Sequence, residues 1–173
     1  ANRITLLDYN NYEIVNKYYK KIVEKSDSTF DEELSFTFKS KDKDRMLFEI
    51  VRSIKAIGDN AIVYCPLKVQ VGRLSKKIIN SRALGTHNHS DYSDFIEHVS
   101  QRFDSNWSLV SALENGIGMH HGLIPKYIQK EIVSLFNNKM LSLLISTTTI
   151  TEGVNTSAKN IIVIDSKKGD KPL

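Results

Sequence analysis

Residues 116–165 read GIGMHHGLIPKYIQKEIVSLFNNKMLSLLISTTTITEGVNTSAKNIIVID, and this stretch decides the fold. Residues 116–119 form a candidate short strand, and Pro125 suits the first position of a helix because its φ angle is fixed. The buried face of that helix would carry Ile128, Ile132, Leu135 and Phe136. Two further apolar strands are expected at 141–145 and 160–165. Strands that alternate with helices predict a parallel sheet with helices on both faces.

The same alternation begins further upstream. Residues 61–65 form a short apolar run ended by Pro66, as expected for a buried parallel strand. Val71, Leu74 and Ile78 then recur at helical spacing. Residues 81–106 are polar and are interpreted as an insertion with a helix around 92–103. The pattern as a whole predicts a three-layer α/β domain with a central parallel sheet.

The first 58 residues have a different pattern. Apolar residues between 14 and 23 have helical spacing, and residues 34–38 alternate in polarity, which is a weak strand signal. A stronger helical stripe runs over residues 46–57. We therefore divide the chain into an N-terminal arm with helices, residues 1–58, and a main domain, residues 59–173.

The composition is ordinary for a soluble globular chain, with 40% hydrophobic and 25% charged residues. No apolar run approaches the roughly 20 residues of a membrane span, so no membrane partner is expected. Cys65 is the only cysteine, which excludes an internal disulfide and favours a reducing, cytoplasmic location. The formal charge is +4, and the excess lies within residues 61–173. That excess favours an anionic partner, although a solvated mixed-charge surface explains it equally well.

Three loops leave the carboxyl ends of the expected strands, which is where ligands gather in such sheets. They cover residues 66–68, 120–125 and 146–155. The third loop is the most informative, because it offers threonine hydroxyls, main-chain N–H groups and Gly153. Such groups donate to phosphate oxygens without carrying a full charge. A threonine-rich turn that caps a short helix would show the same residues, so both interpretations stay open at this point.

Three blocks in this order resemble the second RecA-like lobe, the helicase C-terminal domain, of superfamily-two helicases. The resemblance is greatest to the DExH-type branch that contains the superkiller RNA helicases. Residues 61–66 and the helix after them resemble motif IV. HHGLIPK at 120–126 resembles the histidine–histidine–glycine loop, and TTTITEGVN at 147–155 resembles motif V. The resemblance covers about residues 60–166 and implies a P-loop NTPase-like fold that lacks the P-loop itself, with residues 1–58 coming from the interlobe connection.

The resemblance also implies roles for individual residues. The backbone of single-stranded DNA or RNA would be contacted by Pro66, Lys68, His121, Gly122, Lys126, Thr147 and Thr149. Gly153 and Asn155 would face ATP across a cleft to a first RecA-like lobe of the same chain. That first lobe would hold most of the ATP and its Mg²⁺. The full-length protein would then be an ATP-dependent helicase, with no catalytic residue in the present chain.

Several parts of such a motor are absent from this sequence. It contains no GxxxxGK[ST] loop and no paired-acid motif, and it ends before the glycine–arginine-rich motif VI that would supply an arginine finger. We therefore expect no ATP hydrolysis by this chain alone. Two other functions stay open. One is a non-catalytic RecA-like module that binds nucleic acid or docks a partner. The other is an unrelated doubly wound enzyme that acts on a phosphorylated small molecule.

The histidines could suggest a metal site. His87, His89 and Asp91 form a loose ligand-like set, but no spacing in the chain matches a known zinc motif. We therefore predict no metal site. Cys65, inside an apolar run, is expected to be a buried small hydrophobe.

Overall fold

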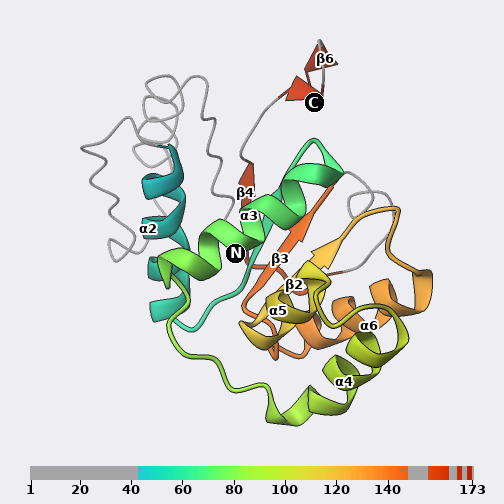
Figure 1. Ribbon diagram of the computed structural model, residues 1–173. Helices are drawn as coiled ribbons and strands as arrows, with labels where there is room; N and C mark the ends of the chain where they lie inside the picture. The colour runs from blue at the N-terminus through green and yellow to red at the C-terminus, as the bar shows by residue number, and fades with distance from the viewer. Residues whose placement is uncertain (1–42, 148–155, 164–166, 169–170, 173) are drawn as a thin grey trace, which may run out of the picture.

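The computed structural model describes residues 43–147 and 156–163, together with the backbone of Lys167–Lys168 and Lys171–Pro172 (Figure 1). The helix expected near 14–23 and the strand expected near 34–38 lie outside the described residues. Lys167–Lys168 and Lys171–Pro172 are the short strands β5 and β6, which pair antiparallel with each other.

Four short strands form one parallel sheet in the order β2-β3-β1-β4. They are β1 (Ala61–Tyr64), β2 (Ile117–His120), β3 (Leu143–Ser146) and β4 (Asn160–Val163). β1, β2 and β3 are buried at every position, as the continuous apolar runs predict. The predicted α/β class with a central parallel sheet is confirmed, and the arrangement is compatible with a RecA-like three-layer domain.

Helices cover both faces of this sheet. α3 (Lys68–Ser81) and α5 (Ser108–Glu114) pack against each other on one face, and α6 (Lys126–Asn137) packs against β2 on the other (Figure 1). This arrangement follows from right-handed crossovers, because the chain moves in opposite directions along the sheet before and after β2. Gly118 in β2 allows α6 to approach closely, since a Cβ atom there would lie 2.7 Å from Ile132 Cγ2.

Residues 82–107 connect α3 to α5 and overlap the segment 81–106 interpreted as an insertion. They contain a 3₁₀ turn, η2 (Ser90–Tyr92), and the helix α4 (Ser93–Arg102), close to the helix expected at 92–103. The helix α5 after them was not expected from the sequence. Its residues Leu109, Val110, Ala112 and Leu113 are all buried, and seven residues are too few to reveal a helical period.

α2 (Lys43–Ala56) belongs to the same hydrophobic core as the sheet. Its apolar stripe is fully or nearly buried and consists of Met46, Leu47, Ile50, Val51 and Ile54. The predicted domain boundary near residue 58 therefore falls between a helix and a strand that share one core. None of the helices within the described ranges combines the length and apolar character that crossing a bilayer requires.

Candidate nucleic-acid interface

The last residues of the four strands lie in one row along the carboxyl edge of the sheet. The register pairs Ser146 with both His120 and Tyr64, and Tyr64 with Val163. Two main-chain hydrogen bonds extend the row by one residue: Cys65 N donates to Ser146 O at 2.8 Å, and Thr147 N donates to His120 O at 3.1 Å. The loops after β1, β2 and β3 therefore leave the sheet side by side.

Two lysines flank this edge. Lys68 is the first residue of α3 and Lys126 the first residue of α6, and both are exposed. Neither helix has an acidic residue in its first turn or a side-chain cap on its free N–H groups. The positive ends of both helix dipoles therefore add to the two ammonium charges. Because α3 and α6 lie on opposite faces, this charge reaches the edge from both sides.

A histidine pair lies between the two lysines. Burial lowers the pKa of His121, and the nearby charge of Lys68 lowers it further. Burial also lowers the pKa of His120, with smaller contributions from Lys126 and His121 that outweigh an opposing main-chain hydrogen bond. Both imidazoles are therefore neutral near pH 7, and the positive charge around them comes from Lys68 and Lys126.

Gln129 holds the loop after His120 in shape. Its buried side chain donates from Nε2 to His121 O at 3.0 Å and to Ile124 O at 2.6 Å. The loop closes on itself through Ile124 N, which donates to His121 O at 3.0 Å. Gly122 is exposed at the tip, and a Cβ atom there would meet nothing within 4 Å. The loop thus has a fixed shape and open space beside its tip.

The edge brings together most of the site residues predicted from the sequence. Pro66, Lys68, His121, Gly122, Lys126 and Thr147 all lie in the loops after β1, β2 and β3 or at the helix starts that follow them. Pro66 has no main-chain N–H to offer a phosphate. Thr147 is only 8% exposed, so its side chain faces largely inward. Thr149, Gly153 and Asn155 lie outside the described residues.

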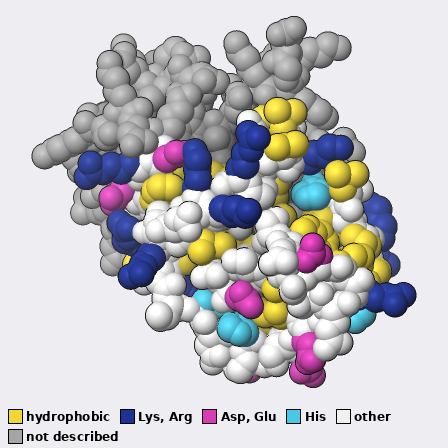
Figure 2. Space-filling model, in the orientation of Figure 1, with side chains coloured by type: hydrophobic (Ala, Val, Ile, Leu, Met, Phe, Trp, Pro, Cys, Tyr) yellow, Lys and Arg dark blue, Asp and Glu magenta, His cyan; other side chains and the backbone are white. Residues whose placement is uncertain are grey.

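Sequence reasoning missed the apolar side chains at this edge. Six large hydrophobic residues are exposed in the described parts of the chain, and four of them adjoin the two lysines: Leu67, Val69, Leu123 and Tyr127. Figure 2 shows hydrophobic, basic and histidine side chains next to one another near the start of α3. Val69 and Tyr127 fall outside the buried stripes of their helices, which is the signal that could have identified them.

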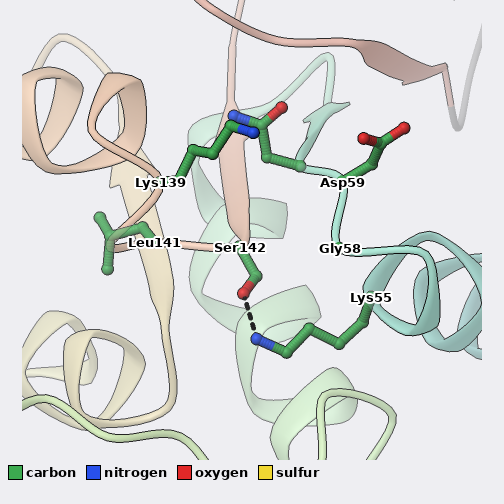
Figure 3. Close-up of a pocket in the computed structure, with 7 residues that line it drawn as sticks. Lys55, Gly58, Asp59, Lys139, Leu141 and Ser142 are labelled. Carbon is green, nitrogen blue, oxygen red and sulfur yellow. Dashed lines mark hydrogen bonds between the residues drawn. The ribbon is translucent and has the colours of Figure 1, made fainter.

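A small pocket of about 70 Å³ lies at the opposite, amino edge of the sheet (Figure 3). Lys55 reaches across it and donates from Nζ to Ser142 Oγ at 2.8 Å. Asp59 at its rim is already paired with Lys159 at 2.9 Å. α2 and α6 both end beside this pocket, and lysines are favourable at the negative ends of helix dipoles. The pocket charges are thus explained by the fold and do not indicate a ligand.

Two histidines of the insertion, His87 and His98, each have a tyrosine hydroxyl as a hydrogen-bond partner. His87 Nε2 lies 2.7 Å from the hydroxyl oxygen of Tyr92, which itself donates to Leu113 O at 2.8 Å. Within residues 43–147 and 156–163, no three His, Cys, Asp or Glu side chains gather as a metal site would require. Burial raises the pKa of the Cys65 thiol to about 12, so Cys65 is not a nucleophile near neutral pH.

No family model matches the chain. Among curated proteins, it is similar to Anti-bacteriophage protein B of Escherichia coli (strain K12), with 33% identity over 139 residues. The match covers 80% of this chain and 18% of that protein. The chain therefore spans about a fifth of the length of this relative.

This comparison corrects the family expected from the sequence. Membership of the DExH-type, superkiller-like branch of superfamily-two helicases is wrong on this comparison, because the relative is named as an anti-bacteriophage protein and no helicase family model matches. The blocks around Pro66, His121 and Thr147 are poor guides to family. Strands followed by polar loops recur at the carboxyl edge of many parallel sheets, where unrelated functions are built on one fold.

Proposed function

We propose that this domain binds the sugar–phosphate backbone of a single-stranded nucleic acid at the carboxyl edge of its sheet. The observation that carries the proposal is the placement of Lys68 and Lys126. Each begins a helix whose first turn holds no acidic residue, and both lie close enough to the histidine pair to lower its pKa values. Ammonium groups and free helix N–H groups are the donors that phosphate oxygens need.

The backbone is the part of a nucleic acid that this edge suits. The described edge residues offer charge and main-chain donors around a fixed loop, without an arrangement of amide side chains that could distinguish base edges. Contacts of this kind confer little sequence preference and respond strongly to salt. His121 and the open space beside Gly122 extend the same surface between the two lysines.

For the full-length protein, we propose an ATP-dependent action on nucleic acid that serves defence against bacteriophages. The name of the relative, Anti-bacteriophage protein B, supports the proposed role in defence. ATP and Mg²⁺ would be bound mainly by another lobe, with Gly153 and Asn155 facing the nucleotide. The chain considered alone would not hydrolyse ATP. A cytoplasmic location also belongs to this proposal.

Binding is tested with the Lys68→Gln/Lys126→Gln variant of the full-length protein and a labelled single strand. Two lost phosphate contacts should weaken binding about tenfold or more near 0.1 M salt, and should make the slope of log affinity against log salt shallower by about 1.4. Lys76→Gln/Lys130→Gln is the matched control, because both lysines are exposed on the same two helices but lie beyond the first turn. Equal affinities for the two variants would refute the proposal.

ATP dependence is tested separately by measuring ATP hydrolysis of the full-length protein with and without single-stranded DNA or RNA. Stimulation that is lost in Lys68→Gln/Lys126→Gln supports an ATP-driven activity coupled to this edge. Strand binding without any hydrolysis would instead identify a non-catalytic binding module.

A further inference from the structure

The exposed apolar side chains at the carboxyl edge are unusual in their position. Leu67 and Val69, each 58% exposed, stand on either side of Lys68, and Leu123 is 68% exposed in the loop before Lys126. Isolated exposed apolar residues are ordinary on protein surfaces. Here, however, four exposed apolar residues lie beside Lys68 and Lys126, and the first helix turns that contain these lysines have no acidic residue. The result is a mixed surface in which charged and apolar areas alternate.

Tyr127 is the aromatic member of this surface, and the insertion holds its ring. His98 of α4 lies against it with ring centroids 6.0 Å apart at an interplanar angle of 73°, and His98 Nε2 is 3.4 Å from the tyrosine hydroxyl oxygen. The tyrosine is still 51% exposed. A ring that is held in place but half exposed can accept a stacked partner with little loss of side-chain freedom.

We propose that Leu123 and Tyr127 contact the faces of unstacked bases of the same strand whose phosphates are held by Lys68 and Lys126. This inference rests on the proposed function and adds base contacts to it. Charge favours a nucleic acid as the occupant, because the surface has two ammonium groups and no acidic residue in the first turns of α3 or α6. Bases in a duplex are stacked on one another, so only a single strand can offer their faces. Every base has a face that can stack, so such contacts would not require a particular nucleotide sequence.

The test compares two probes of equal length in the full-length protein without nucleotide: an intact single strand, and a strand whose central positions are abasic. The wild-type protein should bind the intact strand about tenfold more tightly, since stacking one base on an aromatic side chain changes affinity by roughly 5- to 160-fold. Leu123→Ala/Tyr127→Ala should bind the intact strand as weakly as the abasic one, with unchanged affinity for the abasic strand. Tyr127→Phe retains the ring and should keep most of the preference.

Two further variants separate the possible failures. Lys68→Gln/Lys126→Gln should weaken binding of both probes by the same factor and leave the preference intact. Ile161→Ala removes a side chain that is 40% exposed in β4 and should change neither affinity. If wild type binds neither probe, the proposed function fails. If wild type binds both probes equally, or if Leu123→Ala/Tyr127→Ala keeps the tenfold preference, only the base contacts are refuted.

Discussion

The two edges of the sheet carry lysines in opposite electrostatic settings. At the amino edge, Lys55 lies at the end of α2 and donates to Ser142, and Lys159 pairs with Asp59. The charge of Lys55 meets the negative end of α2, and the charge of Lys159 meets a carboxylate. At the carboxyl edge, Lys68 and Lys126 begin helices and add to their positive ends. A count of lysines would not distinguish the edges, but the direction of the helices does. The comparison identifies the carboxyl edge as the one suited to an anionic ligand.

The largest expected effect is at the amino edge, where Gly116 precedes β2 with φ of +72° and a Cβ atom would lie 2.6 Å from His87 Nδ1. Gly116→Ala should lower the free energy of unfolding by about 2–4 kcal/mol, because left-handed backbone strain adds to overpacking. Chemical denaturation measures this. Gly85→Ala is the control, since φ there is +64° but nothing lies within 4 Å of a Cβ atom, and it should lose only about 1–2 kcal/mol. Strand affinity should not change in either variant. A weaker affinity in Gly116→Ala would mean that the edges are not independent.

At the carboxyl edge, Gln129→Leu should lower both stability and strand affinity. The variant leaves Ile124 O without the amide that Gln129 supplies, while His121 O keeps its bond from Ile124 N. An unpaired buried carbonyl has a penalty of about 1–3 kcal/mol. Denaturation and strand titration on the same preparation give both quantities. Gln101→Leu, at an exposed position on α4, should change stability by less than about 0.5 kcal/mol. Normal affinity in a destabilised Gln129→Leu protein would show that the shape of the loop does not matter for binding.

A smaller effect is expected from Asp59→Asn at the amino edge. Its ion pair with Lys159 is partly exposed, the lysine side chain being 57% and the aspartate 11% accessible. Loss of such a pair should reduce stability by about 0.2–1 kcal/mol, and high salt should remove the difference. Strand affinity should stay the same, because the positive charge that this variant unmasks lies at the wrong edge. Tighter strand binding by Asp59→Asn would contradict that assignment.

The last prediction concerns pH and has opposite signs for stability and binding. The pKa values of His87, His120 and His121 are lowered in the folded state, chiefly by burial, so the unfolded chain binds more protons below its usual histidine pKa near 6.5. The contribution of these histidines to the free energy of unfolding should therefore be fully present at about pH 7.5. It should fall as the pH drops through about 6.5 towards the lowered pKa values of the folded state. Strand affinity should rise at the lower end of this range, as the pH falls through the lowered pKa of His121, because a protonated His121 adds charge beside the phosphates.

Two variants separate these contributions, with stability and affinity measured at both ends of the pH range. His87→Gln should reduce the loss of stability at low pH and leave the gain in affinity. His121→Gln should remove the gain in affinity. If affinity falls with pH in the wild-type protein, the position of the strand relative to His121 is wrong.

The parts of the fold with a clear hydrophobic period could be predicted from the sequence. The four strands of the parallel sheet and the helices α2, α3, α4 and α6 lie within a few residues of their expected positions. α5 could not be predicted, because seven residues give no measurable period. Pro125 was expected inside its helix but lies one position before it, since its ψ angle of 140° is extended.

The candidate site was only partly predictable. Lys68, His121 and Lys126 could be placed at one edge because parallel strands bring their carboxyl ends together. The exposure of Leu123 and Tyr127 depends on how the loop and α6 pack, which no local pattern contains. Gln129 has an ordinary helical position in the sequence. Only the folded chain brings its amide to the carbonyl groups of His121 and Ile124, eight and five residues earlier.

The shortness of the strands limits the conditions under which the edges can be told apart. Four residues of strand span about 13 Å, whereas the Debye length is about 8 Å at 0.15 M ionic strength and about 30 Å at 0.01 M. In dilute buffer, the electrostatic potentials of the two edges would therefore overlap, and the lysines of both edges would attract a polyanion together. Near physiological ionic strength, each edge acts separately, so an assay in dilute buffer would hide the polarity that the parallel sheet creates.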